Sequence, residues 1–515
     1  MKYIKLFTVF LIVMLWGSCA KDLGNYDYQE INEVTITGID GEYRSIFNRD
    51  TLRINPAIQF SNEEDNKRYQ YRWIVRKALS FEDTIGRTRS LEYPVTVPPD
   101  NYKLIFQITD MESDLVWEKS ATYVVGTLLS RGILLMGETE EGFAEVDLIS
   151  MATDTTVIRG LLTSSGLPRL TGGIAVQHTG GLIPAESKLW VFTKDGSYFV
   201  DRSSFAGSTA NNFAKLTYTN LPISPQGMHP VLLAPQINNI TGTIGEGFAR
   251  LMVTSDGNIY GGNYMENGGD YYANPINREA EKPQRLLEAA PFLLYSLKGT
   301  NSMLWYDKTS ERFMRIPSFY NNFTSHPLRD HPDDPFPWNQ SSFGRTLVYA
   351  ENTGNTDGGA VFGNSYAIMK DPINNYFIYK LYVNGAVPLK TGYFPVKKLA
   401  TNFERAQQYA FSSYRTVVFY VVDHKLFAYD YNPGNEKLYE ITLPTTDQVT
   451  MIKFDTQINP LSNSLYIGTY NATRKGTLQR YTLGSNPNTV DLHPVAQEKW
   501  ENLSKIINWS WRAVN

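Results

Sequence analysis

Pairs of short apolar strands recur along most of this chain, and their spacing constrains the fold more than any other feature. Examples are Val191-Phe-Thr-Lys-Asp-Gly-Ser-Tyr-Phe and Met252-Val-Thr-Ser-Asp-Gly-Asn-Ile-Tyr, in which an Asp-Gly turn joins two strands. Glycine supplies the left-handed backbone that a tight hairpin requires. Seven such units begin roughly 50 to 60 residues apart. They span residues 133–149, 188–200, 250–261, 302–316, 361–383, 416–429 and 464–483.

This spacing is typical of the four-stranded blades of a β-propeller whose loops are somewhat longer than minimal. We therefore predict a propeller over residues 127–515, with seven blades favoured over six or eight. The competing prediction is two further β-sandwiches. Helix is scarce in the pattern, and only residues 278–289 and 497–507 are expected to form more than a turn or two.

The segment before the propeller has a different rhythm, with five short alternating strands separated by turn-rich stretches. These strands are expected at residues 34–38, 51–54, 69–75, 102–109 and 121–125. Their number and spacing predict an immunoglobulin-like sandwich over residues 31–126, with Trp73 between its sheets. The chain of 515 residues exceeds what one core usually organises, which favours this two-domain, all-β arrangement.

The first residues have the order of a bacterial lipoprotein signal. Lys2 and Lys5 precede an apolar run, which ends at Trp16 and is followed by Gly17-Ser18-Cys19. The run is too short to span a bilayer as a permanent helix. We predict that residues 1–18 are removed, that Cys19 is acylated, and that residues 19–30 form a tether to the membrane. Trp16 stands where such signals prefer leucine, which is a departure from the usual pattern.

Composition excludes several classes of function. Cys19 is the only cysteine, so its acylation would leave no thiol for disulfides, metal sites or catalysis. The net charge is -4 and no basic stripe is visible, which argues against a general nucleic-acid binder. No nucleophile elbow, phosphate loop, zinc helix or calcium loop of a known kind occurs. We accordingly expect no cofactor, no metal and no catalytic residue.

Two histidines, His326 and His331, lie near each other in a proline-rich segment. Asp330, Asp333 and Asp334 stand close by and have the chemistry of metal ligands. The spacing corresponds to no known metal motif, so an ordinary polar loop is the favoured interpretation.

Aromatic loops rich in Asn and Gly are the best candidates for ligand binding. Flat rings can stack on the apolar face of a sugar while amides bond to its hydroxyls. The alternative, which we weight more heavily, is that these aromatic side chains pin long loops to the protein. The candidate residues are Tyr264, Asn267, Tyr271, Tyr272, Tyr320 and Trp338.

Three stretches carry a resemblance to a known family. They are Ser18-Cys19-Ala-Lys-Asp-Leu-Gly-Asn-Tyr-Asp-Tyr-Gln-Glu, Tyr71-Arg-Trp, and Ser130-Arg-Gly-Ile-Leu-Leu-Met with the later Glu145-Val-Asp-Leu-Ile-Ser. Here the chain resembles the PKD-like lipoproteins of gut Gram-negative bacteria, over residues 18 to about 150. The resemblance implies an ancillary surface lipoprotein encoded beside a Sus-type pair, in which a substrate-binding lipoprotein lids a TonB-dependent barrel transporter. It carries over only Cys19, as the anchor.

The sequence thus predicts a non-enzymatic outer-membrane lipoprotein that binds a polysaccharide or the transporter complex. The alternatives are a propeller glycan hydrolase or lyase and a surface adhesin. Acidic, His or Tyr side chains meeting from several blades would favour catalysis, and a flat apolar patch would favour adhesion. Lys21-Asp22 offers a single acid after the cysteine, which leaves the periplasmic leaflet as the alternative to surface exposure.

Overall fold

The computed structural model is all-β and divides into two compact units. Residues 1–96 and 100–124 form the first unit, and residues 97–99 and 125–515 form the second. The structure describes residues 32–61, 68–78, 80–152, 154–179, 188–219, 221, 228–238, 249–263, 272–273, 275–317 and 324–512. Over these ranges no helix is both long enough and apolar enough to cross a membrane.

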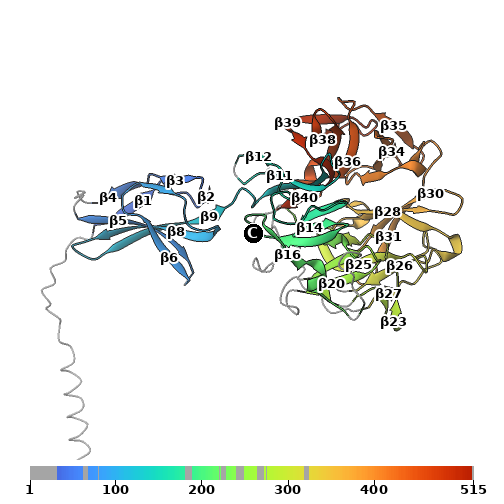
Figure 1. The fold of residues 1–515 in the computed structure, drawn as a ribbon, viewed down its shortest axis with the longest axis horizontal. Coiled ribbons are helices and arrows are strands. Elements are labelled where there is room, and N and C mark those ends of the chain that lie inside the picture. Colours follow the sequence, from blue (N-terminus) through green and yellow to red (C-terminus); the bar gives the residue numbers. More distant parts are fainter. Residues whose placement is uncertain are drawn as a thin grey trace, which may run out of the picture. The chain divides into compact units, whose positions relative to one another are not determined.

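The first unit is a sandwich of one five-stranded sheet and two strand pairs (Figure 1). The large sheet has the order β2-β9-β8-β5-β6, and the pairs are β1-β4 and β3-β7. Trp73 on β5 is fully buried, its ring centroid lies 4.4 Å from that of Phe106, and its indole donates to the carbonyl of Thr88 at 3.1 Å. The strands are β1 (Val34–Thr37), β2 (Glu42–Ile46), β3 (Thr51–Ile54), β4 (Ala57–Phe60), β5 (Tyr69–Lys77), β6 (Phe81–Gly86), β7 (Leu91–Pro94), β8 (Asp100–Asp110) and β9 (Val116–Gly126).

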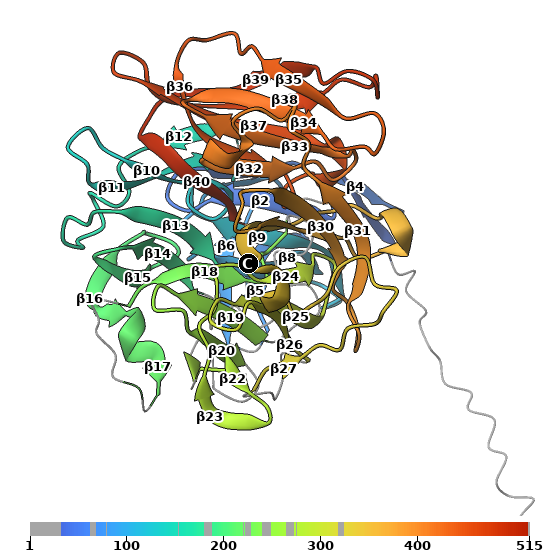
Figure 2. The same cartoon turned by 90° about the vertical axis from the view of Figure 1, so that its right-hand side faces the viewer.

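The second unit is a β-propeller in which seven sheets surround a common centre (Figure 2). Each predicted hairpin unit supplies two adjacent inner strands of one sheet, which confirms the propeller and, over the residues that the structure describes, its seven blades. The first three blades contain β10 (Gly132–Glu138), β11 (Ala144–Ser150) and β12 (Thr156–Ile158); β13 (Gly173–His178), β14 (Leu189–Thr193), β15 (Gly196–Val200) and β16 (Gly207–Asn212); and β17 (Thr217–Tyr218), β18 (Pro230–Ala234), β19 (Ala249–Thr254), β20 (Ile259–Asn263) and β21 (Tyr272–Ala273).

A strand pair, β22 (Arg278–Glu279) with β23 (Lys282–Leu286), precedes the fourth blade. The remaining blades contain β24 (Leu294–Ser296), β25 (Gly299–Asp307), β26 (Arg312–Ile316) and β27 (His326–Pro327); β28 (Thr346–Asn352), β29 (Ser365–Lys370), β30 (Tyr376–Tyr382) and β31 (Leu389–Pro395); β32 (Gln408–Phe411), β33 (Val417–Val422), β34 (Lys425–Asp430) and β35 (Lys437–Ile441); and β36 (Gln448–Phe454), β37 (Ser464–Asn471), β38 (Lys475–Leu483) and β39 (Leu492–Leu503). Short 3₁₀ turns are η2 (Phe213–Leu216), η3 (Ser341–Phe343), η4 (Asp357–Gly359), η5 (Phe403–Arg405) and η6 (Pro460–Ser462).

The last strand closes the ring. β40 (Lys505–Arg512) pairs antiparallel with β10, from Gly132 opposite Arg512 to Glu138 opposite Lys505, and so completes the first blade. Trp509 and Trp511 on β40 are buried in one cluster with apolar residues of β10, β36 and β37. The first and seventh blades therefore share a core, and closure buries apolar surface that an open arc would expose.

Both predicted helices are wrong. Residues 278–289 contain β22 and β23, and residues 497–507 belong to β39 and β40. Leu503 and Ile506 are buried in the core shared by the first and last blades, while Asn502 has a φ of 58° just before the chain enters β40. Pairing with neighbouring strands outweighs the weak local preference for helix.

Candidate functional site

Long segments gather at the propeller face where the innermost strands end. Three of them follow the first strands of their blades, β28, β32 and β36, and the fourth follows β30, which runs parallel to β28 and ends at the same face. We call residues 353–364, 383–388, 412–416 and 455–463 the loop face. The Gly354 amide donates to Ser413 Oγ at 3.0 Å, and Ser412 Oγ donates to Asn463 Oδ1 at 3.2 Å. A Cβ at Gly299 on β25 would lie 3.2 Å from the Phe362 ring and 3.5 Å from Asn384 Oδ1, so the first two segments both approach this glycine.

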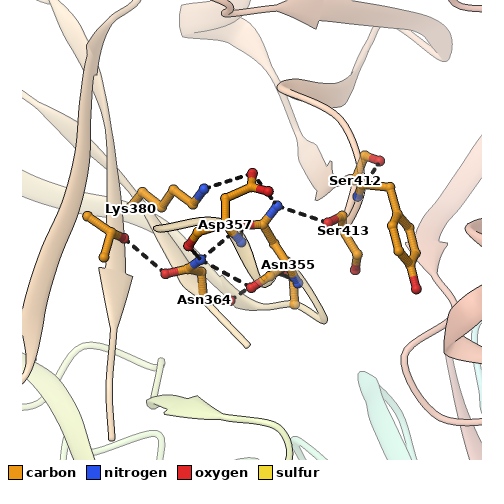
Figure 3. A network of polar contacts seen from close by, with 9 residues as sticks. Asn355, Asp357, Asn364, Lys380, Ser412 and Ser413 are labelled. Atoms are coloured by element: carbon orange, nitrogen blue, oxygen red, sulfur yellow. Dashed lines mark hydrogen bonds and ion pairs between the residues drawn. The ribbon is translucent and has the colours of Figure 1, made fainter. Parts of the chain in front are cut away.

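A buried amide, Asn364, organises the first of these segments (Figure 3). Its Nδ2 donates to the carbonyl of Asn355 at 3.1 Å, to Asn355 Oδ1 at 2.9 Å and to the carbonyl of Asp357 at 3.0 Å. Its Oδ1 accepts from Thr391 Oγ1 on β31 at 2.9 Å. Asn364 is fully buried, so these bonds replace water around both ends of the amide.

The same network extends to the neighbouring blade. Asn355 Nδ2 donates to Asp357 Oδ2 at 2.9 Å and to the carbonyl of Ser413 at 3.0 Å, and Lys380 Nζ lies 3.1 Å from Asp357 Oδ2 (Figure 3). The hydrogen bond from Asn355, with help from Lys380, lowers the pKa of Asp357. Gly363 has a φ of +103°, and a Cβ there would lie 2.4 Å from the carbonyl oxygen of Thr353, so the tight return of this segment requires glycine.

The pinned segments carry apolar side chains that face solvent. Val361 is 61% exposed and Phe362 is 37% exposed, although the backbone beneath them is held by the network. Val387, Tyr414 and Leu461 are also exposed, one on each of the other three segments. These five side chains are the apolar groups that the loop face offers to another molecule.

The centre of the ring is bridged at this face. Gln236 Nε2, after β18, donates to Thr456 Oγ1 at 2.9 Å, and Gln457 Nε2 donates to the carbonyl of Ile237 at 2.8 Å. These bonds link the third and seventh blades across the centre. Beside the bridge lies a cavity of about 30 Å³, lined in part by His178. That volume suits one or two water molecules, whereas organic ligands need several hundred Å³.

Two ionisable side chains with shifted pKa values, Glu351 and Lys453, lie partly buried in the propeller. Burial raises the pKa of Glu351 to about 7, although the amide of Phe411 donates to its carboxylate at 2.8 Å. Burial likewise lowers the pKa of Lys453 to about 8, and its Nζ donates to the carbonyl of Trp509 at 2.8 Å. Glu351 Oε2 also accepts from the Tyr349 hydroxyl at 3.2 Å, and Lys453 Nζ also lies 3.4 Å from Asn508 Oδ1, so each group is held by neighbouring residues of the propeller.

A larger cavity of about 230 Å³ lies at the seam between the first and seventh blades. Glu145 and Asp147 line it, and both carboxylates are engaged with the protein. Glu145 accepts from the amides of Leu162 and Thr163, and Asp147 accepts from the amide of Gly160 and from the amide and hydroxyl of Ser504. These acids hold the backbone at the seam, which leaves fewer lone pairs for a reaction.

The acidic segment near His326 is organised by a lysine. Lys390 Nζ lies 3.1 Å from Asp330 Oδ1 and 2.6 Å from Asp334 Oδ2, and it sits 4.5 Å from the Trp338 ring centroid. An ammonium group thus occupies the place between the two acids. Among the described residues no group of three or more His, Cys, Asp or Glu side chains is arranged to hold a metal ion.

Two of the predicted ligand-binding residues lie in the described part of the chain, and both are buried. Tyr272 is fully buried and packs near Phe213, with ring centroids 5.5 Å apart. Trp338 is 3% exposed and packs against Phe313 at 6.0 Å. Both rings therefore pack inside the propeller. Cys19, Tyr264, Asn267, Tyr271 and Tyr320 lie outside the described residues, so ligand binding by those loops stays a prediction.

The residues that build the loop face were missed from the sequence. Residues 351–359 read Glu-Asn-Thr-Gly-Asn-Thr-Asp-Gly-Gly, which indicates a polar turn but does not tell which asparagine is buried. Exposed Val361 and Phe362 follow directly, and an apolar pair inside such a turn-rich stretch was the available signal.

Comparison with known proteins supports the N-terminal assignment. Residues 19–173 match the PKD-like family, a region that covers the sandwich and reaches β13. No curated protein matches the chain.

Solved structures with similar folds have low identity. A quinoprotein alcohol dehydrogenase-like protein from Bacteroides thetaiotaomicron is 14% identical, with 93% of this chain and 99% of that chain covered and a TM-score of 0.38. A proposed 6-phosphogluconolactonase from Bacteroides fragilis is 8% identical, with 74% and 98% covered and a TM-score of 0.40. The extracellular domain of a proposed one-component system from B. thetaiotaomicron is 9% identical, with 90% and 57% covered and a TM-score of 0.34.

Proposed function

We propose that this protein is a non-enzymatic lipoprotein, anchored through Cys19 to the outer membrane and facing outside, that serves as an ancillary component of a Sus-type uptake system. Its loop face would dock a protein partner, the TonB-dependent barrel transporter or the substrate-binding lipoprotein that lids it. The observation that carries the proposal is segment 353–364, which carries exposed Val361 and Phe362 on a backbone bonded to the buried Asn364 side chain. The PKD-like match at the N-terminal end supports the class.

A protein partner suits this surface better than a glycan. Val361, Val387 and Leu461 are aliphatic, and aliphatic groups pack against other apolar groups rather than against hydroxyls. A pre-organised backbone also lowers the ordering entropy that binding must overcome. A polysaccharide bound elsewhere on the chain stays compatible with this role.

The test is co-purification of the acylated protein from outer membranes, with identification of the barrel that accompanies it. We expect Val361→Asp/Phe362→Asp to reduce recovery of the barrel at least tenfold, because two charges would be buried at the contact. Ile373→Asp is the matched control, since Ile373 is 78% exposed on the turn between β29 and β30, away from the loop face.

Recovery of the same barrel with the wild type and the double variant would remove the loop face from the proposal. Recovery of no transporter, together with turnover of a polysaccharide by the soluble protein, would replace it with the glycan hydrolase or lyase. An adhesin would use the same apolar face, and it would bind host or neighbouring cell surfaces in the absence of any transporter.

A further inference from the structure

The turn between β8 and β9 carries three exposed apolar side chains on the sandwich. Met111 is 56% exposed, Leu115 is 37% exposed and Val116 is 48% exposed. The Asp110 amide donates to the carbonyl of Leu115 at 2.9 Å, so the turn is closed at its base. We call Met111, Leu115 and Val116 the apolar tip.

A buried carboxylate, Asp110, holds this turn in place. Its oxygens accept from Arg68 Nε at 2.8 Å, from the Glu112 amide at 3.0 Å and from Ser113 Oγ at 2.7 Å. Asp110 is 1% exposed, and the hydrogen bonds from Arg68 are the largest cause that keeps its pKa well below the ordinary value. The apolar tip is therefore a built feature and not a loose loop.

The chain enters the sandwich at the same end. Asn32, the first described residue, donates from Nδ2 to the Tyr69 hydroxyl at 2.6 Å, and Tyr69 pairs in register with Asp110 across β5 and β8. The Met111 amide in turn donates to the carbonyl of Arg68 at 3.0 Å. The start of the described chain and the apolar tip are thus linked by direct contacts.

Asn32 follows Cys19 by 13 positions. Any chain of that length reaches at most about 47 Å when extended, and about 20 Å as a random coil. An acylated Cys19 would therefore keep this end of the sandwich close to the bilayer, and a second contact there becomes effectively intramolecular.

We infer that the apolar tip rests in the lipid surface as a second membrane contact, which fixes the end of the sandwich that faces the bilayer. The inference rests on the lipid anchor proposed above. Glu112 and Asp114 are exposed beside the tip. Arg68 Nη1 lies 3.1 Å from Glu112 Oε2, so the charge of Arg68 partly neutralises that of Glu112. The remaining negative charge favours a zwitterionic surface over an anionic one.

The test uses the full acylated chain in phosphatidylcholine vesicles whose acyl chains carry a fluorescence quencher. Because Cys19 is the only cysteine, Glu112→Cys supplies one free thiol beside the tip for a fluorescent label, and it keeps the Glu112 amide and the Ser113 hydroxyl that bond Asp110. Ser80→Cys is the control; it follows β5, which runs from Tyr69 to Lys77, so it lies about 27 Å from the tip. We expect the tip label to be quenched at least about threefold more strongly, as insertion of 5 to 10 Å would produce.

Replacing the tip in the labelled protein with Met111→Ser/Leu115→Ser/Val116→Ser should reduce quenching to the level of the control while the protein stays anchored. Adding anionic lipid should also weaken the quenching. Equal quenching at both positions in an anchored protein would overturn the tip contact alone. If mass spectrometry found no acyl chain on Cys19 and the protein did not float with the vesicles, the proposed anchor would fail and the tip contact with it.

Discussion

Removing the side-chain amide of Asn364 tests whether the hydrogen bonds of this amide hold residues 353–364 in place. Asn364→Ala deletes three donated hydrogen bonds and one accepted hydrogen bond, all in a fully buried position. The backbone amide of Asn364, which donates to the Asn355 carbonyl at 2.7 Å, is unchanged by the substitution and reports on the segment.

The size of the effect follows from the number of bonds. A typical hydrogen bond contributes about 0.5 to 1.5 kcal/mol, so four bonds sum to about 2 to 6 kcal/mol, and relaxation of the segment lowers the local effect to about 3 kcal/mol. Since about 1.4 kcal/mol is a factor of ten, hydrogen exchange at the Asn364 position should become roughly a hundredfold faster. Exchange measured by mass spectrometry on peptides that cover residues 353–364 would show it.

Asn486→Ala is the matched control, because Asn486 lies in an exposed turn and its side chain accepts one hydrogen bond, from the Asn488 amide at 3.0 Å. It should leave exchange in residues 353–364 unchanged. If Asn364→Ala also left it unchanged while the propeller stayed folded, the segment would be held by something other than the amide network, and our account of the loop face would be wrong.

Two further substitutions probe the interior of the propeller. Burial raises the pKa of Glu351 from 4.5 to about 7. Between pH 4.5 and about pH 7 the folded protein therefore keeps a proton on Glu351 that the unfolded chain has released. The free energy of unfolding falls as the pH rises across this window. Glu351→Gln should therefore raise the urea midpoint at pH 8 but not at pH 4, and an equal effect at both pH values would contradict this origin. Trp511→Ala should lower the free energy of unfolding of the propeller by about 3 to 5 kcal/mol. The reason is that the Trp511 indole is buried in the core shared by the first and seventh blades, where the propeller closes. Trp117→Ala in the sandwich is the control, and an unchanged propeller transition with Trp511→Ala would show that closure does not depend on this packing.

Much of the architecture could be predicted because each blade repeats one local pattern. The Asp256-Gly257 turn is an example: Gly257 has a φ of +74°, as a tight hairpin between β19 and β20 requires. The two-residue turn between β33 and β34 has both Asp423 and His424 in left-handed conformations, so there a tight hairpin forms without glycine. Strand periodicity within one hairpin is local information, and local information survives in a single sequence.

The predictions that were wrong, and the residues that were not predicted, depend on partners far away in the sequence. Residues 505–512 are a strand because β10, which lies far earlier in the chain at Gly132–Glu138, offers an edge to pair with. The burial of Tyr272 and Asn364 likewise depends on which segments fold over them. A sequence marks these side chains as aromatic or polar, but it does not state which neighbours exclude water from them.

The loop face combines two properties that rarely occur together by accident. Exposed aliphatic side chains such as Val361 are tolerated singly on any surface, but buried asparagines are kept only where all their hydrogen bonds are made. Here Asn355 and Asn364 bond to the backbone of the loop that carries Val361 and Phe362, so much of its order is built before any contact is made. A surface that needed only solubility would have no use for such order, whereas a surface that docks a partner gains affinity from it.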